Sequence, residues 1–233
     1  IAGILVAGIF GLIISIPAMK LDGPYLVLAT VGFGEIVRLV LLNWTPVTRG
    51  AAGLTGIPYP SLFGLNIKSE QEFFYLILAF VALGVYVATR IANSKIGRTL
   101  RAIRDDSIAA EAMGVNVNRY KTAAFVISAM FAGVAGGLMG SFSGVTSPDN
   151  FTFDDSVSFL CMSVIGGNTT VIGGIIGAVL LTFLSEALRF FQGTRLIIYG
   201  FILILTVIYM PNGLVGIVEN IKRKFRKSKS AIE

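Results

Sequence analysis

Residues 73–91 read FFYLILAFVALGVYVATRI, an apolar run whose only charged member is Arg90. A helix rises about 1.5 Å per residue, so about 20 such residues cross the roughly 30 Å hydrocarbon layer of a membrane. The whole chain is 55% hydrophobic and 14% charged, which is more apolar surface than a soluble core of this size buries. The sequence therefore predicts an all-α, polytopic transmembrane helical bundle.

Apolar runs separated by Gly, Pro and charged residues predict about seven membrane segments within one transmembrane domain over residues 1–218. They cover residues 1–16, 25–42, 73–91, 121–142, 156–165, 171–191 and 196–210. The fifth run is short for a full crossing, so a tilted, broken or re-entrant segment is an alternative there. Because an apolar run is already under way at Ile1, we expect earlier residues and assign no signal peptide.

Glycines recur in two of these runs and predict places where helices approach closely. They are Gly133, Gly136, Gly137 and Gly140 in the fourth run and Gly173, Gly174 and Gly177 in the sixth. A bend beside a polar pathway is the alternative use of such residues. Tight packing is the favoured interpretation.

Several classes of chemistry lack the residues that they need. Histidine is absent, which removes HExxH zinc motifs and Ser-His-Asp triads. The chain has no GxxxxGK[ST] run, so it should carry no Walker-type nucleotide site of its own. Cys161 has no second thiol to pair with and is interpreted as structural. We therefore expect no catalysis, no metal site and no cofactor bound by this chain.

A charged stretch, GRTLRAIRDDSIAAEAMGVNVNRY at residues 97–120, follows the run at 73–91. A helix over 97–114 is too polar to span a membrane, and in proteins most helical stability comes from tertiary packing of one face. Spacings of three and four would place four residues on one face: Arg101, Arg104, Ile108 and Glu111. The helix needs a surface to pack against. The residues alone favour a groove in a partner protein and lipid head groups equally.

Loop charge predicts orientation, because Lys and Arg gather on the cytoplasmic side of a membrane protein. Basic residues dominate 90–121 and the tail at 219–233, so both should be cytoplasmic. The polar loop at about 44–72 and the acidic stretch SPDNFTFDD at 147–155 should then lie outside. The basic tail could alternatively bind anionic lipid. Since most basic residues flank membrane runs, the net charge of +6 does not indicate nucleic-acid binding.

Polar residues inside the runs are candidates for a substrate pathway. Glu35 and Arg38 lie three apart in the second run and can neutralise each other. Charge inside a membrane is costly and often functional, but a structural ion pair is as well favoured as contact with substrate. Hydroxyl and amide side chains give the remaining candidates: Thr30, Ser158 and Asn168. Hydroxyls also bond back to their own helix without any transport role.

The passage GRTLRAIRDDSIAAEAMGVNVNRYK resembles the cytoplasmic coupling loop of ABC importer permeases, in the version found in the branched-chain amino acid permease family. Glu111, Ala112 and Gly114 take the positions of its E-A-A…G element. Other blocks resemble the same family in the same order, and together they cover nearly the whole chain. They are LDGPYLVLATVGFGEIVRLVLLNW with TRGAAGLTGIP, VIGGNTTVIGGIIGAVLLTFLSE, and IYGFILILTVIYMPNGLVG.

The resemblance implies an inner-membrane permease subunit that imports branched-chain or related hydrophobic amino acids. It implies a homologous second permease subunit or a second copy of this chain, two cytoplasmic ATPases that use ATP, and an external binding protein. The residues expected to couple to the ATPases are Arg101, Arg104, Ile108, Glu111, Ala112 and Gly114. The alternatives are an ABC permease for urea, a sugar or a nucleoside, and a secondary transporter or channel, which should show inverted repeats or coupling-ion sites.

Overall fold

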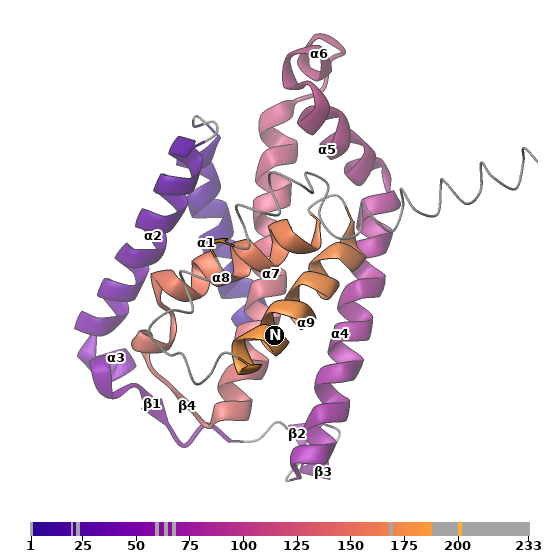
Figure 1. The fold of residues 1–233 in the computed structure, drawn as a ribbon. Coiled ribbons are helices and arrows are strands. Elements are labelled where there is room, and N and C mark those ends of the chain that lie inside the picture. The colour runs from indigo at the N-terminus through magenta and orange to yellow at the C-terminus, as the bar shows by residue number, and fades with distance from the viewer. Residues whose placement is uncertain are drawn as a thin grey trace, which may run out of the picture. The chain divides into compact units, whose positions relative to one another are not determined.

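The chain forms two compact units, Ile1–Phe151 and Thr152–Glu233, in a computed structural model. The structure describes residues 2–19, 21, 24–58, 61–62, 65–66, 69–167, 170–187 and 200–201. Helices dominate the described part of both units (Figure 1).

The first unit is built on long apolar helices that coincide with the first four predicted runs. They are α1 (Ala2–Ala18), α2 (Pro24–Asn43), α4 (Glu70–Asn93) and α7 (Val117–Ser143). Three of these, α2, α4 and α7, are long and apolar enough to cross a membrane, and α1 is a shorter apolar helix. A helical, multi-pass membrane protein is therefore confirmed.

Local signals at the ends of these helices explain where they begin and stop. The Ser69 side chain accepts a hydrogen bond from the Gln71 amide and caps α4. The negative charge of Glu70 in the first turn interacts favourably with the positive end of the helix dipole. α7 ends at Gly144, whose φ of 65° lies in the left-handed region where glycine is unstrained. Apolar runs and polar caps together fix the lengths of these helices.

Small residues bring α1 and α7 into close contact. A Cβ atom on Gly133 would lie 2.7 Å from the Ala7 Cβ and 2.7 Å from the Gly3 carbonyl oxygen, so a larger residue would push the two helices apart. Across the same contact, a Cβ on Gly11 would lie 2.6 Å from the Ala129 Cβ. The packing interpretation is confirmed for Gly133. A Cβ atom on Gly136 or Gly137 would meet none of the described residues within 4 Å, so the structure shows no close contact at those two positions.

Short elements close the end of the first unit where α2 and α7 finish. They are α3 (Thr45–Thr48), η1 (Gly50–Ala52), β1 (Leu54–Thr55), β4 (Val145–Thr146) and η2 (Pro148–Asn150). β1 pairs antiparallel with β4, with Leu54 opposite Thr146, and β2 (Ser61–Leu62) pairs with β3 (Leu65–Asn66). The predicted loop at 44–72 therefore carries structure that joins it to the end of α7.

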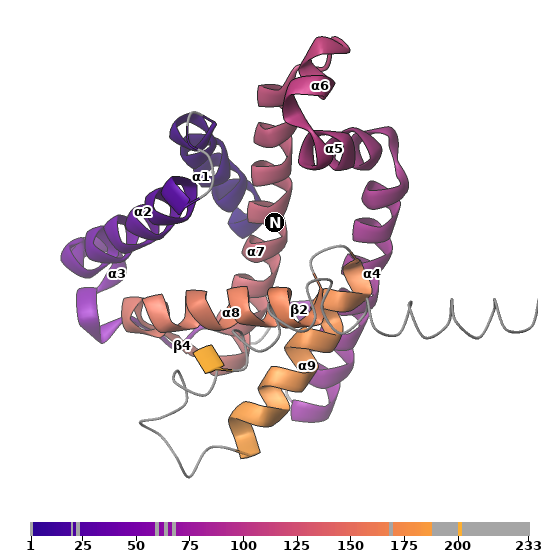
Figure 2. The ribbon, with the colours of Figure 1, turned by 45° about the horizontal axis from the view of Figure 1, so that its top comes forward.

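Two helices close the opposite end of this unit. α5 (Lys95–Asp105) runs across from α4 toward α7, and α6 (Ser107–Ala112) lies beyond it, away from the long helices (Figure 2). β1 and β4 lie at the other end of α7 (Figure 1). The charged stretch and the Gly/Pro-rich loop thus occupy opposite ends, as the charge pattern predicted.

The second unit contains α8 (Phe153–Gly166) and α9 (Val171–Ala187), which pack together. The Thr152 and Asp155 side chains form a capping box, and this start gives α8 14 residues where the sequence predicted about ten. A helix of that length rises about 21 Å, which is less than the roughly 30 Å of hydrocarbon. A full crossing by α8 alone would require a thinner layer or further residues.

Glycines again set the contact between these two helices. A Cβ atom on Gly166, Gly173 or Gly177 would meet backbone atoms of the facing helix, so the packing interpretation of the last two is confirmed. Beside them, Cys161, Ile165 and Leu181 form a buried cluster, which is the structural environment predicted for the cysteine. The predicted run at 196–210, apart from the helical pair 200–201, and the tail at 219–233 lie outside the described residues.

Candidate functional site

The charged stretch between α4 and α7 folds as two helices, not one. Asp106 has an extended backbone, with φ −156° and ψ 106°, and its Oδ1 accepts hydrogen bonds from the amides of Ile108 (3.0 Å) and Ala109 (2.9 Å). An Asp side chain that satisfies the free amides of a new helix stabilises a start at that point. The prediction of one continuous helix over 97–114 is therefore wrong, and Asp106 is where it breaks.

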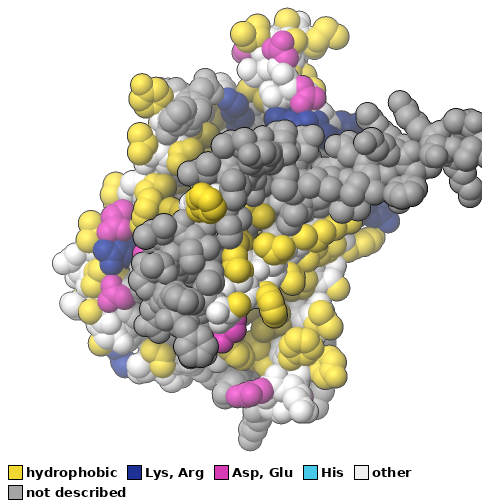
Figure 3. Space-filling view, in the orientation of Figure 1, with side chains coloured by type: hydrophobic (Ala, Val, Ile, Leu, Met, Phe, Trp, Pro, Cys, Tyr) yellow, Lys and Arg dark blue, Asp and Glu magenta, His cyan; other side chains and the backbone are white. Residues whose placement is uncertain are grey.

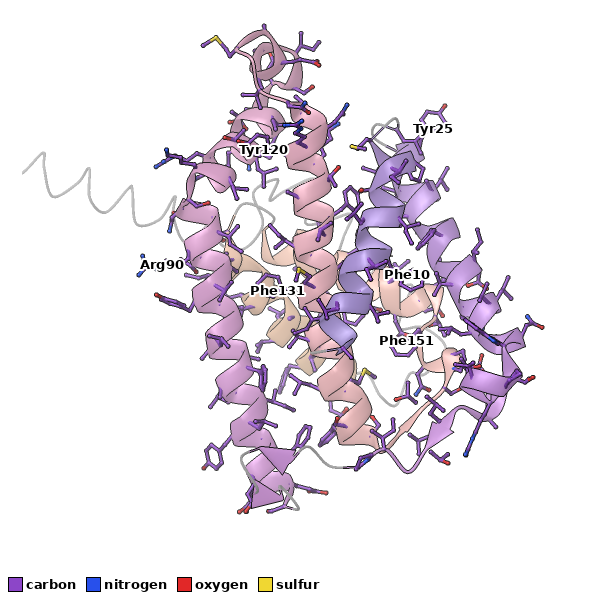
Figure 4. All side chains as sticks on the ribbon, turned by 180° about the vertical axis from the view of Figure 1, so that it is seen from behind. Phe10, Tyr25, Arg90, Tyr120, Phe131 and Phe151 are labelled. Carbon is purple, nitrogen blue, oxygen red and sulfur yellow. The ribbon has the colours of Figure 1, made fainter. Side chains whose placement is uncertain are left out.

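A small apolar cluster holds the two helices against the start of α7. Ile103 from α5, Ala110 from α6 and Val117 from α7 are all buried, and Val115 and Tyr120 pack against them. Tyr120 lies in the first turn of α7, below α6 (Figure 4). α6 is too short to be stable alone in water, so this cluster fixes its position.

The coupling residues predicted from the sequence are all exposed: Arg101, Arg104, Ile108, Glu111, Ala112 and Gly114. Ile108 is 81% exposed, and Met113, which the sequence interpretation did not select, is 85% exposed. Large apolar side chains this open on a polar segment are typical of a surface that a partner covers. The position of Met113 next to the turn glycine Gly114, whose φ is 84°, is the signal that could have identified it.

The two arginines selected as coupling residues have bonds within the chain. The Arg101 Nη2 donates to the Ala92 carbonyl at 3.0 Å and thereby satisfies the end of α4. The Arg104 Nη2 lies 2.8 Å from the Asp105 Oδ1. Because of the break at Asp106, these arginines do not share one helical face with Ile108 and Glu111, as a continuous helix would require.

A second charged site joins α2 to η2 at the other end of the unit. The Arg38 Nη2 lies 2.7 Å from the Glu35 Oε1, as their spacing predicted. The Arg38 Nη1 also lies 3.2 Å from the Asp149 Oδ1, which belongs to the acidic stretch after α7. The structure thus supports an ion-paired arrangement at this site and adds a third member that sequence reasoning did not connect with the pair.

Hydrogen bonds around β1 and β4 hold Asp149 in place. The Ser147 hydroxyl donates to the Ala51 carbonyl at 3.1 Å and accepts from the Asp149 amide at 3.3 Å. Gly53, with φ 68°, runs so close to β4 that a Cβ would lie 2.5 Å from the Thr146 carbonyl oxygen. The pairing of Arg38 with Asp149 therefore depends on a backbone contact between distant parts of the sequence.

The remaining pathway candidates form local bonds or lie outside the described residues. The Thr30 hydroxyl donates to the Val27 carbonyl at 2.9 Å. The Ser158 hydroxyl donates to the Asp154 carbonyl at 2.8 Å and is buried. Asn168 lies outside the described residues. The two hydroxyls belong to different units, and each shows the back-bonding that the sequence allowed.

Comparison with known proteins gives a consistent set of relatives. Residues 1–207 match the family model for branched-chain amino acid transport system permease components. The chain is 37% identical to the high-affinity branched-chain amino acid transport system permease protein LivM of Salmonella typhimurium, over 90% of this chain and 55% of that protein. It is 36% identical to LivM of Escherichia coli, over 92% of this chain and 56% of that protein.

A second type of relative is also similar. The high-affinity branched-chain amino acid transport system permease protein LivH of Escherichia coli is 28% identical over 77% of this chain and 61% of its own length. The chain spans about half the length of the LivM relatives that it matches. No solved structure matches the chain.

Proposed function

Since the chain belongs to the family of branched-chain amino acid transport system permease components, we propose that it is a permease subunit of an ABC importer. It moves branched-chain or related hydrophobic amino acids inward, and separate ATPase subunits drive it. The observation that carries this proposal is the exposed pair of apolar side chains, Ile108 and Met113, on a short helix that a buried cluster holds in a fixed position.

The tip formed by α6 and its turn has the chemistry of a docking surface. We define the tip as residues 105–118, which carry three carboxylates and no Lys or Arg. Ile108 and Met113 offer apolar area for a groove, and burying a side chain of this size stabilises a complex by about 1.5–3 kcal/mol. Glu111 supplies charge that fixes the register in the groove.

Movement of the tip has a physical route into the membrane helices. Within the tip, Ala110 of α6 packs with Ile103 of α5 and with Val117 at the start of α7, and α7 in turn contacts α1 through Gly133 and Ala129. Packed interfaces shift as units rather than deform continuously. Closure of ATP-loaded ATPase subunits on the tip would therefore move α7 together with α1 and alternate access to the transport route.

The remaining partners follow from the relatives and from charge. The likeness to both LivM and LivH supports a second permease subunit, either a homologue or another copy of this chain. The basic residues on and around α5, and those of the tail at 219–233, support a cytoplasmic location for the tip and for the tail of an inner-membrane protein. The opposite end, with β1, β4 and η2, then faces an external binding protein.

The test is assembly and transport by the complete complex reconstituted in proteoliposomes. Ile108→Ser together with Met113→Ser should weaken retention of the ATPase subunits about 100-fold, about tenfold for each side chain. Uptake of labelled leucine, coupled to ATP hydrolysis, should fall with it. Uptake of urea or ribose in place of leucine would contradict the proposed substrate while leaving the coupling proposal standing.

A matched control separates docking from general loss of apolar surface. Val47 is 57% exposed on α3, at the other end of the unit, so Val47→Ser should leave retention of the ATPase subunits unchanged. Glu111→Ala tests the charged contact alone and should weaken retention less than the double substitution. Equal ATPase retention in the wild type and in the double variant would contradict the docking proposal.

A further inference from the structure

The connection between α4 and α7 carries positive charge in one part and negative charge in another. We define the basic belt as the Lys and Arg residues on either side of the tip: Arg90, Lys95, Arg98, Arg101, Arg104, Arg119 and Lys121. The tip carries the carboxylates Asp105, Asp106 and Glu111. Figure 3 shows the Lys and Arg atoms gathered at the level of α5, with Asp and Glu atoms beyond them on α6. One short connection thus presents two surfaces of opposite charge.

Contacts within the chain use some of this positive charge and leave Lys95 and Arg98 open. Arg104 pairs with Asp105, and Arg101 donates to the Ala92 carbonyl. Lys95 and Arg98 are exposed, and the ion pairs among the described residues involve neither of them. They lie three apart on α5, so their charges project side by side.

Because α5 follows a helix that is long and apolar enough to cross a membrane, we expect α5 at the depth of the lipid head groups. It follows the membrane-length helix α4 after a sharp turn at Ser94 and runs across the end of that helix (Figure 2). Ile96, Leu100 and Ile103 recur at spacings of four and three and form an apolar face, of which Ile103 is buried. A short helix with an apolar face and a basic face is typical of the membrane interface.

A tyrosine and an arginine lie within the last two turns of α4, just before α5. The Arg90 guanidinium lies 5.2 Å from the centre of the Tyr86 ring, and its Nε donates to the Tyr86 hydroxyl at 3.2 Å. Arg90 points outward from α4 (Figure 4). Tyrosine and basic side chains gather at the boundary between hydrocarbon and head groups. Lys95, five residues after Arg90, begins α5 close to this boundary.

We propose that Lys95 and Arg98 form a binding site for the phosphate of an anionic phospholipid. A negative membrane surface attracts the basic belt and repels the three carboxylates of the tip, so the lipid holds α5 while the tip remains free in water. Lipid anchoring and protein docking, which the sequence favours equally for one helix, thus belong to two different helices. The proposal requires only that the chain lies in a membrane.

Lipid affinity of the full-length protein in nanodiscs tests this site. Retention of phosphatidylglycerol by wild type and variants is measured in nanodiscs of an equimolar mixture of phosphatidylglycerol and phosphatidylcholine. Nanodiscs of phosphatidylcholine alone provide the reference without anionic lipid. Lys95→Gln together with Arg98→Gln should lower the affinity for phosphatidylglycerol about 25-fold, about fivefold per residue. Equal affinity in wild type and double variant would overturn the proposal.

Controls separate a lipid site from net charge, from folding and from other anions. Arg49→Gln removes an exposed positive charge at the opposite end of the unit and should keep the wild-type lipid affinity. The double variant should melt with the wild type in phosphatidylcholine alone. Displacement of the lipid by soluble glycerol phosphate would show a site for free anions and overturn the lipid assignment. Loss of ATPase subunits from the double variant in phosphatidylcholine would show a protein-binding surface and overturn it as well.

Discussion

The two ends of the Ile1–Phe151 unit are stabilised in different ways. At one end, β1 pairs with β4, Ser147 bonds to Ala51, and Arg38 joins Asp149. Polar groups there find partners within the chain. At the other end, a cluster of three buried residues supports α5 and α6, and the charged and apolar side chains around it face outward.

This difference indicates which end needs other molecules. An end whose hydrogen bonds and charges are satisfied internally keeps its shape alone. The second end exposes Ile108 (81%) and Met113 (85%) more fully than the paired end exposes Trp44 (54%) and Val47 (57%), so covering it with protein or lipid would add more stability. The comparison therefore predicts that substitutions at the first end mainly change folding, and that exposed substitutions at the second mainly change binding.

The largest effect is expected for Gly53→Ala at the paired end. Gly53 has φ 68° and ψ −179°, a region that only glycine adopts without strain, and the new Cβ would lie 2.5 Å from the Thr146 carbonyl oxygen. Strain and crowding together should lower the free energy of unfolding by about 4 kcal/mol. Thermal unfolding in detergent measures this change.

Gly114 provides the matched control for that substitution. Its φ is 84°, and a Cβ there would meet no atom within 4 Å. Gly114→Ala therefore adds backbone strain alone and should cost about 1–2 kcal/mol. Equal losses at the two glycines would show that close pairing of β1 with β4 contributes nothing, and the contrast between the two ends would fail.

A smaller effect is expected for Ile103→Ala, which removes the buried support of the tip. Ile103 is 7% exposed and Ile108 is 81% exposed, so the same substitution at the two positions compares support with surface. Ile103→Ala should destabilise the packing of α5 and α6 by about 2–3 kcal/mol, and Ile108→Ala should change it by less than about 0.5 kcal/mol.

Hydrogen exchange of the α5 and α6 amides measures this local stability, because local opening exposes them without unfolding the long helices. Faster exchange in Ile103→Ala, with unchanged exchange across α4 and α7, is the expected pattern. Equal protection in the two variants would mean that Ile103 does not support the tip.

The long helices and the position of the charged stretch could be predicted from the sequence because their signals are local. Continuous apolar runs locate α2, α4 and α7, and the charge pattern places α5 and the Gly/Pro-rich loop at opposite ends. The start of α8 after Thr152 could also be predicted, since Thr followed three residues later by Asp155 forms a capping box. The apolar run alone predicts a shorter segment.

Other features could not be predicted because they depend on competing or distant interactions. Within 97–114, helical spacing favoured one helix, and the bonds from the Asp106 side chain to two amides decided against it. The contact between Arg38 and Asp149 joins residues 111 positions apart and exists only because β4 returns the chain to β1. Spacing predicts the neighbour Glu35 but contains no information about Asp149.

The smallest effect is expected for the charges of the paired end. Glu35 and Asp149 both approach Arg38, whose side chain is 24% exposed, and the Asp149 side chain is 58% exposed. Pairs this open contribute about 0.2–1 kcal/mol, so a double-mutant cycle with Arg38→Gln and Asp149→Asn should give a coupling energy in that range.

The cycle is measured by thermal unfolding at low and high salt, and the coupling should fall as salt rises. A coupling energy near zero at low salt would mean that β1, β4 and Ser147 alone hold η2 beside α2. A leucine uptake rate that falls far more in Arg38→Gln than in Asp149→Asn would instead assign Arg38 to the substrate route.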